Sequence, residues 1–319
     1  MRRKNLPLLI TTAICGLLYS IGGIAFGWFS KPVVLVNLFT DNAFLGVAAI
    51  GLTLVILSGG IDLSVGAVIG CVSISSALLI EQYQWSPSVV VFLMLMGGLL
   101  FGGAMGCLIH FFELQPFLVT LAGLFFCRGL GLVLSQESVS ITHPVVEQAG
   151  AWSMPAEAEV SFKVVSIIFL CVLGLGLALS WWSRFGRNIY ALGGSEASAL
   201  LMGLPIGVTK VGVYALSGFC SALAGVVYTI YTSSGNATAA SGLELDAIAA
   251  VVVGGTLLSG GVGHLAGTLM GVLILGIIQT LITFQGTLSS WWTRIVIGVL
   301  LLGFILLQRL LQKSNAKAG

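Results

Sequence analysis

A polar break interrupts an apolar region between Leu54 and Gly70, in the stretch LVILSGGIDLSVGAVIG. Asp62 lies at its centre, two glycines precede it, and the hydroxyls of Ser58 and Ser64 flank it. A carboxylate among apolar residues is costly in a membrane, so it has either a structural or a transport role. In one interpretation Asp62 caps the N-terminus of the next helix, where an acidic side chain is favoured. In the other, which is compatible with the first, the break is a hinge or half-helix end that lines a transport path.

A similar break occurs again later in the chain. The decapeptide LSGGIDLSVG at 57–66 matches LSGGVGHLAG at 258–267, which keeps Leu-Ser-Gly-Gly and the closing glycine. An even number of the membrane spans counted below separates the two copies, which predicts a parallel internal repeat. The second copy lacks the acidic residue and contains His264, which we interpret as an ordinary polar side chain.

The other reactive residues form no catalytic or metal-binding pattern. The six cysteines lie in apolar runs without a CxxC pair, and we interpret them as buried apolar side chains. The LSGG tetrapeptides are similar to a signature of ATP-hydrolysing domains, but the chain has no GxxxxGK[ST] loop to hold phosphates. Ser259 and His264 lack the third group of a hydrolase triad. We therefore expect neither enzyme activity nor a metal site in this chain.

The composition is that of a membrane protein. Of the 319 residues, 57% are hydrophobic and 8% are charged, against about 25% charged residues in soluble domains. A net charge of +2 without a dense basic patch argues against nucleic-acid binding. We expect an all-α helical bundle in the lipid bilayer, with residues 1–319 as one domain. About ten runs are long enough to span a bilayer, at 6–29, 42–58, 62–80, 88–111, 116–135, 162–182, 209–231, 243–259, 263–284 and 291–310.

Positive charges indicate the orientation of these spans. They gather at both termini and in one loop, at Arg2, Arg3, Lys4, Arg184, Arg187, Arg309, Lys313 and Lys317. With ten spans these regions share one side, which the positive-inside rule makes cytoplasmic. The loop at about 136–161 then faces outward. The first apolar run is too long for the core of a secretory signal, so we expect a retained membrane helix.

The loop at about 183–209 contains the signals of a short helix. Ser195 can cap its start, Glu196 suits its first turn, and Gly203 and Pro205 end it. One side of this helix is apolar, with Leu200, Leu201 and Met202. Exposed apolar residues usually mark an interaction site, here a helix that docks into the groove of a partner. The alternative is a helix that lies on the membrane surface.

On the outer side, Glu244 and Asp246 are predicted at the mouth of the span at 243–259. Acidic residues at a helix start can cap it. They can equally contact a delivering protein or a polar substrate, and the sequence does not separate these roles.

Three stretches together resemble the ribose-type permease family of ABC importers: LSGGIDLSVG at 57–66, RFGRNIYALGGSEASALLMG at 184–203 and ELDAIAAVVVGGTLLSGGVG at 244–263. The resemblance extends over nearly the whole chain in order. Within this family, three further motifs are similar to those of the second permeases of bacterial galactofuranose importers. These are NLPL at 5–8, LTDNAFLG at 38–46 with Phe39 inserted, and GTLSSWWTRI at 286–295.

The resemblance implies a bacterial inner-membrane permease with cytoplasmic termini. It also implies a homologous permease as partner, a periplasmic sugar-binding protein, and ABC ATPase subunits that bind ATP and Mg²⁺, so this chain itself holds no cofactor. The loop would couple to the ATPase through Arg184, Gly186, Arg187, Glu196, Leu200, Leu201, Met202 and Gly203. The stretch from Glu196 departs from the EAA motif of other importers, because Ser198 stands at its third position and the glycine comes one residue late.

A sugar is polar and neutral, so its pathway needs hydrogen-bonding groups rather than a fixed charge. We assign to the pathway or gate Asn42, Thr53, Ser58, Gly59, Gly60, Asp62, Ser64, Gly66, Ser259, Gly260 and Gly261. Because the topology puts the first break toward the cytoplasm, we favour a cap and hinge over a substrate ligand for Asp62. The alternative function is an ion-coupled secondary sugar transporter acting alone. The scarcity of charges in the spans argues against that alternative.

Overall fold

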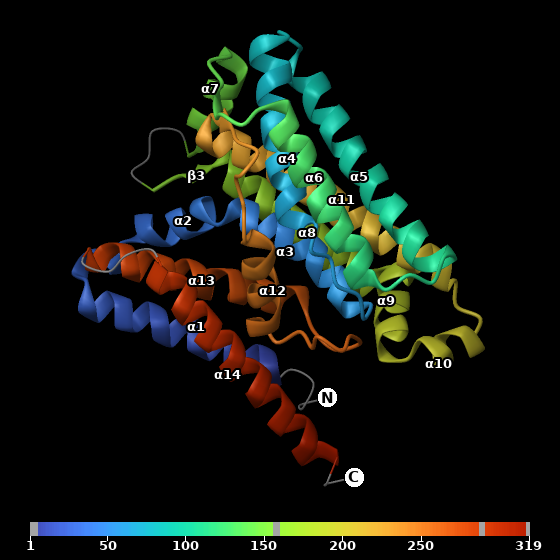
Figure 1. Ribbon diagram of the computed structural model, residues 1–319. Helices are drawn as coiled ribbons and strands as arrows, with labels where there is room; N and C mark the ends of the chain where they lie inside the picture. Colours follow the sequence, from blue (N-terminus) through green and yellow to red (C-terminus); the bar gives the residue numbers. More distant parts are fainter. Residues whose placement is uncertain (1–5, 156–159, 287–290, 317–319) are drawn as a thin grey trace.

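The computed structural model describes residues 6–155, 160–286 and 291–316, which form a helical bundle with two short strand pairs (Figure 1). The predicted basic side chains at positions 2–4, 309, 313 and 317 lie outside the described part. The elements are α1 (Leu6–Ala25), η1 (Gly27–Ser30), α2 (Pro32–Asp41), α3 (Ala43–Leu57), α4 (Val65–Ala77), η2 (Leu78–Gln82), α5 (Pro87–Phe111), α6 (Pro116–Leu134), β1 (Val139–Ser140), α7 (Pro144–Ala151), β2 (Ser153–Met154), β3 (Phe162–Lys163), α8 (Val164–Trp182), α9 (Arg184–Gly194), α10 (Glu196–Leu201), α11 (Ile206–Thr232), β4 (Ser234–Gly235), α12 (Leu243–Val253), α13 (Leu265–Gln285) and α14 (Trp291–Ala316).

Prolines set several helix starts. Pro32, Pro87, Pro116 and Pro144 each occupy the first turn of a helix. The first turn suits proline because its missing amide hydrogen would have no helical partner there. At the other end of α13, Gly286 adopts φ +66° and stops the helix.

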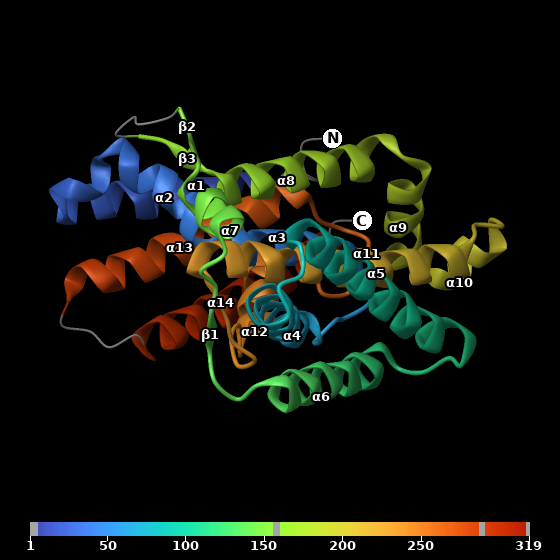
Figure 2. The same ribbon diagram turned by 90° about the horizontal axis from the view of Figure 1, so that it is seen from above.

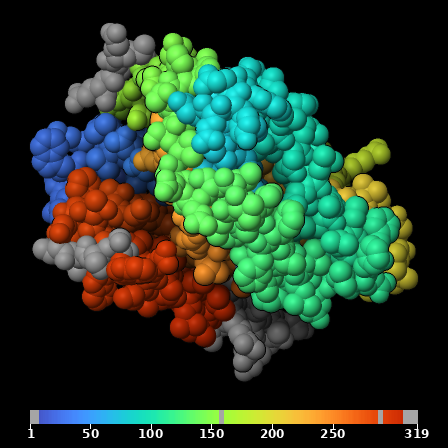
Figure 3. All heavy atoms as spheres, turned by 45° about the horizontal axis from the view of Figure 1, so that its top comes forward, coloured from blue at the N-terminus to red at the C-terminus, as the bar shows by residue number. Residues whose placement is uncertain are grey.

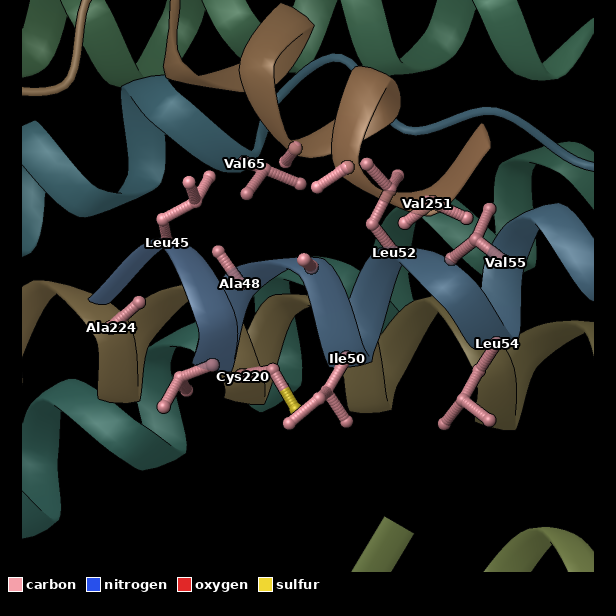
Figure 4. Packing of buried hydrophobic residues seen from close by; sticks show 14 of the residues in the cluster. Leu45, Ala48, Ile50, Leu52, Leu54, Val55, Val65, Cys220, Ala224 and Val251 are labelled. Atoms are coloured by element: carbon pink, nitrogen blue, oxygen red, sulfur yellow. The ribbon is translucent and has the colours of Figure 1, made fainter. Parts of the chain in front are cut away.

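Helix α3 is the centre of the core. Its residues are apolar on all sides, and all but one of those from Ala43 to Leu57 are buried. A helix without a polar face has to be surrounded by protein or lipid. Here protein surrounds it, because α8, α9, α11, α12 and α13 all contact α3. Figure 4 shows Leu52 and Val55 directed toward Val251 of α12, and Ile50 on the side of Cys220 of α11.

The peripheral helices carry the exposed apolar side chains. Leu100 of α5, Phe125 and Val133 of α6, and Val299 of α14 are more than half exposed, as lipid-facing residues are. Figure 3 shows the green and teal atoms of α5 and α6 covering one face, with the red atoms of α13 and α14 beside them. The expected all-α polytopic membrane protein is thereby confirmed.

The bundle has two distinct ends. The start of α1, the end of α14, and the helices α9 and α10 lie toward the bottom and lower right of Figure 1, which we call the α9–α10 end. The opposite end, which we call the α7 end, carries α7 and the strand pair β2–β3. Figure 2 shows that α10 projects beyond the other helices at this end. Ten spans would put the predicted cytoplasmic face at the α9–α10 end.

The spans are less uniform than the ten predicted. Among the described residues, seven helices are long and apolar enough to cross a membrane, or eight when α2 and α3 are counted as one span bent by 57°. The apolar described part of α14 is shorter, Trp291–Leu306. The predicted span at 243–259 is wrong as a continuous helix. Helix α12 has 11 residues, about 16 Å of helix, whereas a bilayer core is about 30 Å thick.

An irregular segment precedes α12 and runs back into the bundle. We call residues 233–242 the re-entrant segment. Its start pairs with β1, Val139 opposite Gly235, and its end brings the Ala240 carbonyl against Gly66 in the first turn of α4. Irregular backbone at membrane depth is tolerated where protein buries it. The re-entrant segment and α12 together therefore replace one regular membrane helix.

Candidate functional site

The Asp62 carboxylate is fully buried and fully engaged. One oxygen, Oδ1, accepts hydrogen bonds from the Ser64 amide at 2.9 Å and the Ser64 hydroxyl at 2.6 Å, and Oδ2 accepts one from the Ser217 hydroxyl at 2.7 Å. The carboxylate lies just before α4, whose N-terminal amides favour a negative charge. It also ties α4 to α11, which carries Ser217. With no exposed surface, Asp62 has the position of a structural anchor before α4, whose N-cap residue is Ser64 and whose first amides receive no side-chain cap.

The two glycine breaks of the internal repeat contact each other. The Gly261 amide donates to the Leu57 carbonyl at 2.9 Å, and a methyl group at Gly260 would come within 2.8 Å of the Gly59 Cα atom. Gly59 and Gly260 adopt φ values of +86° and +83°, which glycine tolerates best. Gly193 of α9 lies in the same contact, against Leu57 and Gly261. Both copies therefore lie at the α9–α10 end, as a parallel repeat requires.

A polar pocket of about 600 Å³ opens beside the first break. It is lined by Ser58, Gly59, Gly60, His110, Glu113, Gln115, Glu196, Leu200, Lys210 and Tyr214, among others. The Lys210 ammonium and the Glu196 carboxylate pair across its rim at 2.6 Å. This pocket is thus lined both by residues predicted for the gate and by residues predicted for the ATPase-coupling loop, although the two sets are far apart in the sequence. The first break is the inner wall of this pocket, and α10 is its rim.

The predicted loop helix is present, and a second helix precedes it. The Ser195 hydroxyl accepts a hydrogen bond from the Ser198 amide at 3.2 Å, and Gly203 at φ +72° follows the helix end, so the predicted cap and stop of α10 are confirmed. Helix α9 starts at the capping Ser183, with Gly186 packed against the last carbonyls of α8. The side chains of six of the predicted coupling residues in and just after the two helices are exposed, those of Arg184, Arg187, Glu196, Leu200, Leu201 and Met202.

Leu201 is the most exposed apolar side chain of this loop. Its exposed fraction is 89%, and those of Leu200 and Met202 are 66% and 65%. Ala199 of α10 packs on Leu192 of α9 and Ile206 of α11, and the outer part of α10 extends past the bundle (Figure 2). Three adjacent exposed apolar side chains at the end of the bundle form the kind of patch that a partner covers.

Three of the predicted gate residues lie elsewhere. Thr53 is buried in the α3–α13 interface, where its hydroxyl bonds that of Thr268 at 2.8 Å. Asn42 lies at the bend between α2 and α3, at the α7 end, and its amide donates to the Leu38 carbonyl at 2.9 Å. Gly66 packs against the re-entrant segment. Asn42 and Thr53 are therefore not beside the first break, because α3 carries Asn42 a full helix length away from it, and their assignment to the pathway stays a prediction.

The outer position predicted for Glu244 is also wrong. Its carboxylate lies against Gly66 inside the bundle, because the re-entrant segment carries the start of α12 inward. Asp246, on the other side of α12, lines pockets together with residues near the outer end of α13, including Thr283. The two acidic residues that the sequence groups together therefore face different surroundings. Ser259 is exposed at the tip of the second break, next to the buried Gly260.

Sequence reasoning missed Arg128, which holds the re-entrant segment in place. Its guanidinium donates to the carbonyls of Ala237 at 2.9 Å and Ala239 at 3.1 Å. Buried backbone carbonyls without a helical partner need such donors. A usable signal was present, since Arg128 is the one charged residue of the apolar run at 116–135. A charge inside a membrane helix indicates an internal partner.

Broken apolar helices, an irregular re-entrant segment and polar pockets at both ends define a polytopic membrane protein of the transporter class. Comparison with known proteins identifies the family. The family model described as "Branched-chain amino acid transport system / permease component" matches residues 34–305. The chain belongs to this family, as a permease of the ribose-type ABC importers, and the predicted resemblance is confirmed.

Individual relatives match along most of their length. The inner membrane ABC transporter permease protein YjfF of Escherichia coli K12 is 48% identical over 97% of this chain and 93% of its own. The fructose import permease protein FruG of Bifidobacterium longum is 37% identical over 96% of this chain and 92% of its own. The ribose import permease protein RbsC of Bacillus subtilis is 37% identical over 88% of this chain and 86% of its own. No solved structure matches this chain.

Proposed function

We propose that this chain is the membrane permease subunit of an ABC importer for a monosaccharide, with galactofuranose as the first candidate. A periplasmic sugar-binding protein delivers the sugar, and a separate ATPase subunit binds ATP and Mg²⁺ and drives the transport. The chain pairs with a homologous permease in the bacterial inner membrane, with both termini in the cytoplasm. Fructose and ribose import by relatives supports the substrate class. The motifs at 5–8, 38–46 and 286–295 support the choice of sugar.

The observation that carries the proposal is the position of α10. Its exposed residues Leu200, Leu201 and Met202 project from the α9–α10 end, where an ATPase would dock an amphipathic helix in a groove. The same helix forms the rim of the 600 Å³ pocket. Gly193, within α9, touches both glycine breaks. A displacement of α9 and α10 by the ATPase would thus also displace the glycine breaks, which we assign to the gate.

Reconstitution tests the function directly. The chain is incorporated into liposomes with its partner permease, ATPase and binding protein, and uptake of radiolabelled galactofuranose, ribose and fructose is measured. We expect uptake that needs both ATP and the binding protein, with galactofuranose preferred. An ATPase variant that cannot hydrolyse ATP is the control and should abolish uptake. Uptake driven by an ion gradient without ATP would establish a secondary transporter instead, and failure with every sugar would refute the proposal.

A further inference from the structure

Two adjoining polar pockets lie at the α7 end, remote from the glycine breaks. One, of about 460 Å³, lies between α2, α3, α11, α12 and α13, and the other, of about 420 Å³, lies between α12, α13 and α14. Asp246, Gln279 and Thr283 line both pockets and thus form the boundary between them. Helices α2, α12, α13 and α14 occupy neighbouring positions in the left half of Figure 1.

The polar groups of these pockets have unused hydrogen-bonding capacity. Within the described residues, the Asp246 carboxylate accepts no hydrogen bond, and the side-chain amide of Gln279 neither donates nor accepts one. Asp41 accepts only the Tyr231 hydroxyl, at 3.0 Å, among the described residues. Asp62, by contrast, is saturated by three donors. Asp41 and Gln279 are exposed and Asp246 is half-buried, so their side chains are accessible from the pockets and can hydrogen-bond a polar ligand there.

The chemistry of the lining fits a neutral sugar. Carboxylates accept hydrogen bonds from hydroxyl groups, a glutamine amide both donates and accepts, and Arg294 at the edge of the second pocket donates. In the first pocket the ring of Phe44 meets Tyr231 at 6.3 Å, and such rings pack against apolar C–H faces. Ligand pockets of small molecules are typically about 300–1,000 Å³, apolar with a few convergent polar groups. Each of the two pockets has this size.

We infer that these two pockets form the sugar-entry site of this chain, with Asp246 and Gln279 as its central contacts. The inference rests on the proposed function and specifies where the sugar first meets the permease. A sugar released at the α7 end would exchange its water shell for Asp246, Gln279 and Thr283. It would then be handed toward the glycine breaks. The site lies on α12 and α13, which flank the second break. The helices that would contact the sugar are therefore also those that would move if the second break opened.

Gln279→Leu and Asp246→Asn in the reconstituted importer test the inference. Gln285→Leu is the matched control, because Gln285 is an exposed glutamine on the same helix that lines neither pocket. The probe is radiolabelled galactofuranose, with ribose in parallel, at limiting concentrations of loaded binding protein. ATP hydrolysis stimulated by the loaded binding protein is measured in the same vesicles, and it reports docking and coupling independently of sugar contacts.

We expect Gln279→Leu and Asp246→Asn to lower sugar uptake at limiting substrate roughly tenfold, the effect of one lost hydrogen bond of about 1.4 kcal/mol. Stimulated ATP hydrolysis should stay near the wild-type rate, and Gln285→Leu should transport normally. Wild-type uptake in both variants would overturn the entry site while leaving the function intact. An equal loss in Gln285→Leu, or a parallel loss of ATP hydrolysis, would also overturn it. Absence of uptake by the wild-type importer with either sugar would instead refute the proposed function.

Discussion

Leu201→Asp is the sharpest perturbation of the proposed ATPase contact. The Leu201 side chain is 89% exposed, so its replacement removes almost no packing within the chain. If the ATPase covers it, burial contributes about 1.5–3 kcal/mol to docking, and each 1.4 kcal/mol is about tenfold in affinity. Leu201→Asp should therefore lower the affinity for the ATPase by a factor of about ten to a hundred. The desolvation of the new carboxylate adds to this loss.

The assay measures binding and stability separately. The permease pair is purified in detergent and titrated with the ATPase subunit, and the affinity is read by fluorescence or by co-elution. Thermal unfolding of the permease pair is followed in parallel and should not change. Sugar uptake in liposomes should fall with the loss of ATPase binding. The expected pattern is a folded, inserted permease that no longer responds to ATP.

The matched control is Val145→Asp on α7. Val145 is 53% exposed at the opposite end of the bundle, so the same chemical change there should leave the affinity for the ATPase unaltered. Wild-type ATPase affinity in Leu201→Asp would refute the docking role of α10. A loss of thermal stability that matched the loss of affinity would show that Leu201 serves the fold instead.

Three further changes test the structure around the breaks, each read as thermal stability of the purified chain. Asp62→Asn keeps one side-chain oxygen as acceptor and should stay folded and transport sugar, whereas Asp62→Leu leaves several buried donors unpaired at about 1–3 kcal/mol each. Equal destabilisation by both would show that the fold needs the charge itself, whereas loss of uptake by a well-folded Asp62→Asn would return the charge to the mechanism. Gly260→Ala forces a methyl group onto the backbone of Gly59 and should lower the stability of the chain more than Gly286→Ala does. Gly286 has the same unfavourable sign of φ, but the space around it is open. Equal effects of the two changes would refute the contact between the glycine breaks. Arg128→Met loses two charged hydrogen bonds of about 1.5–3 kcal/mol each and should be less stable than Arg128→Lys. Identical melting temperatures of the two variants would contradict the role of Arg128 in holding the re-entrant segment.

Local signals predicted the regular helices well. The apolar runs at 116–135 and 162–182 became α6 and α8 with nearly the same bounds, because a long apolar run can only be a helix in a bilayer. The loop helix α10 was equally accessible, since the cap at Ser195 and the stop at Gly203 act within a single turn. These features depend on residues adjacent in the chain.

Tertiary features could not be predicted in this way. Hydropathy reports burial and not backbone conformation, so the apolar stretch beyond Val253 was predicted as helix although Gly254 there packs on Gly267. The place of Glu244 depends on the path of the re-entrant segment, which follows from contacts with Gly66. Likewise, Gln279 belongs to a polar site only because α12 brings Asp246 beside it.

The glycine contact at the α9–α10 end has a mechanical consequence. Gly59, Gly193, Gly260 and Gly261 meet backbone against backbone, with no side chain between the three segments. A side chain can change rotamer and absorb a displacement, whereas touching main chains cannot. A shift of α9 would therefore bear directly on the main chain of both halves of the repeat. A larger residue at any of these positions would act as a permanent wedge that holds the two halves apart.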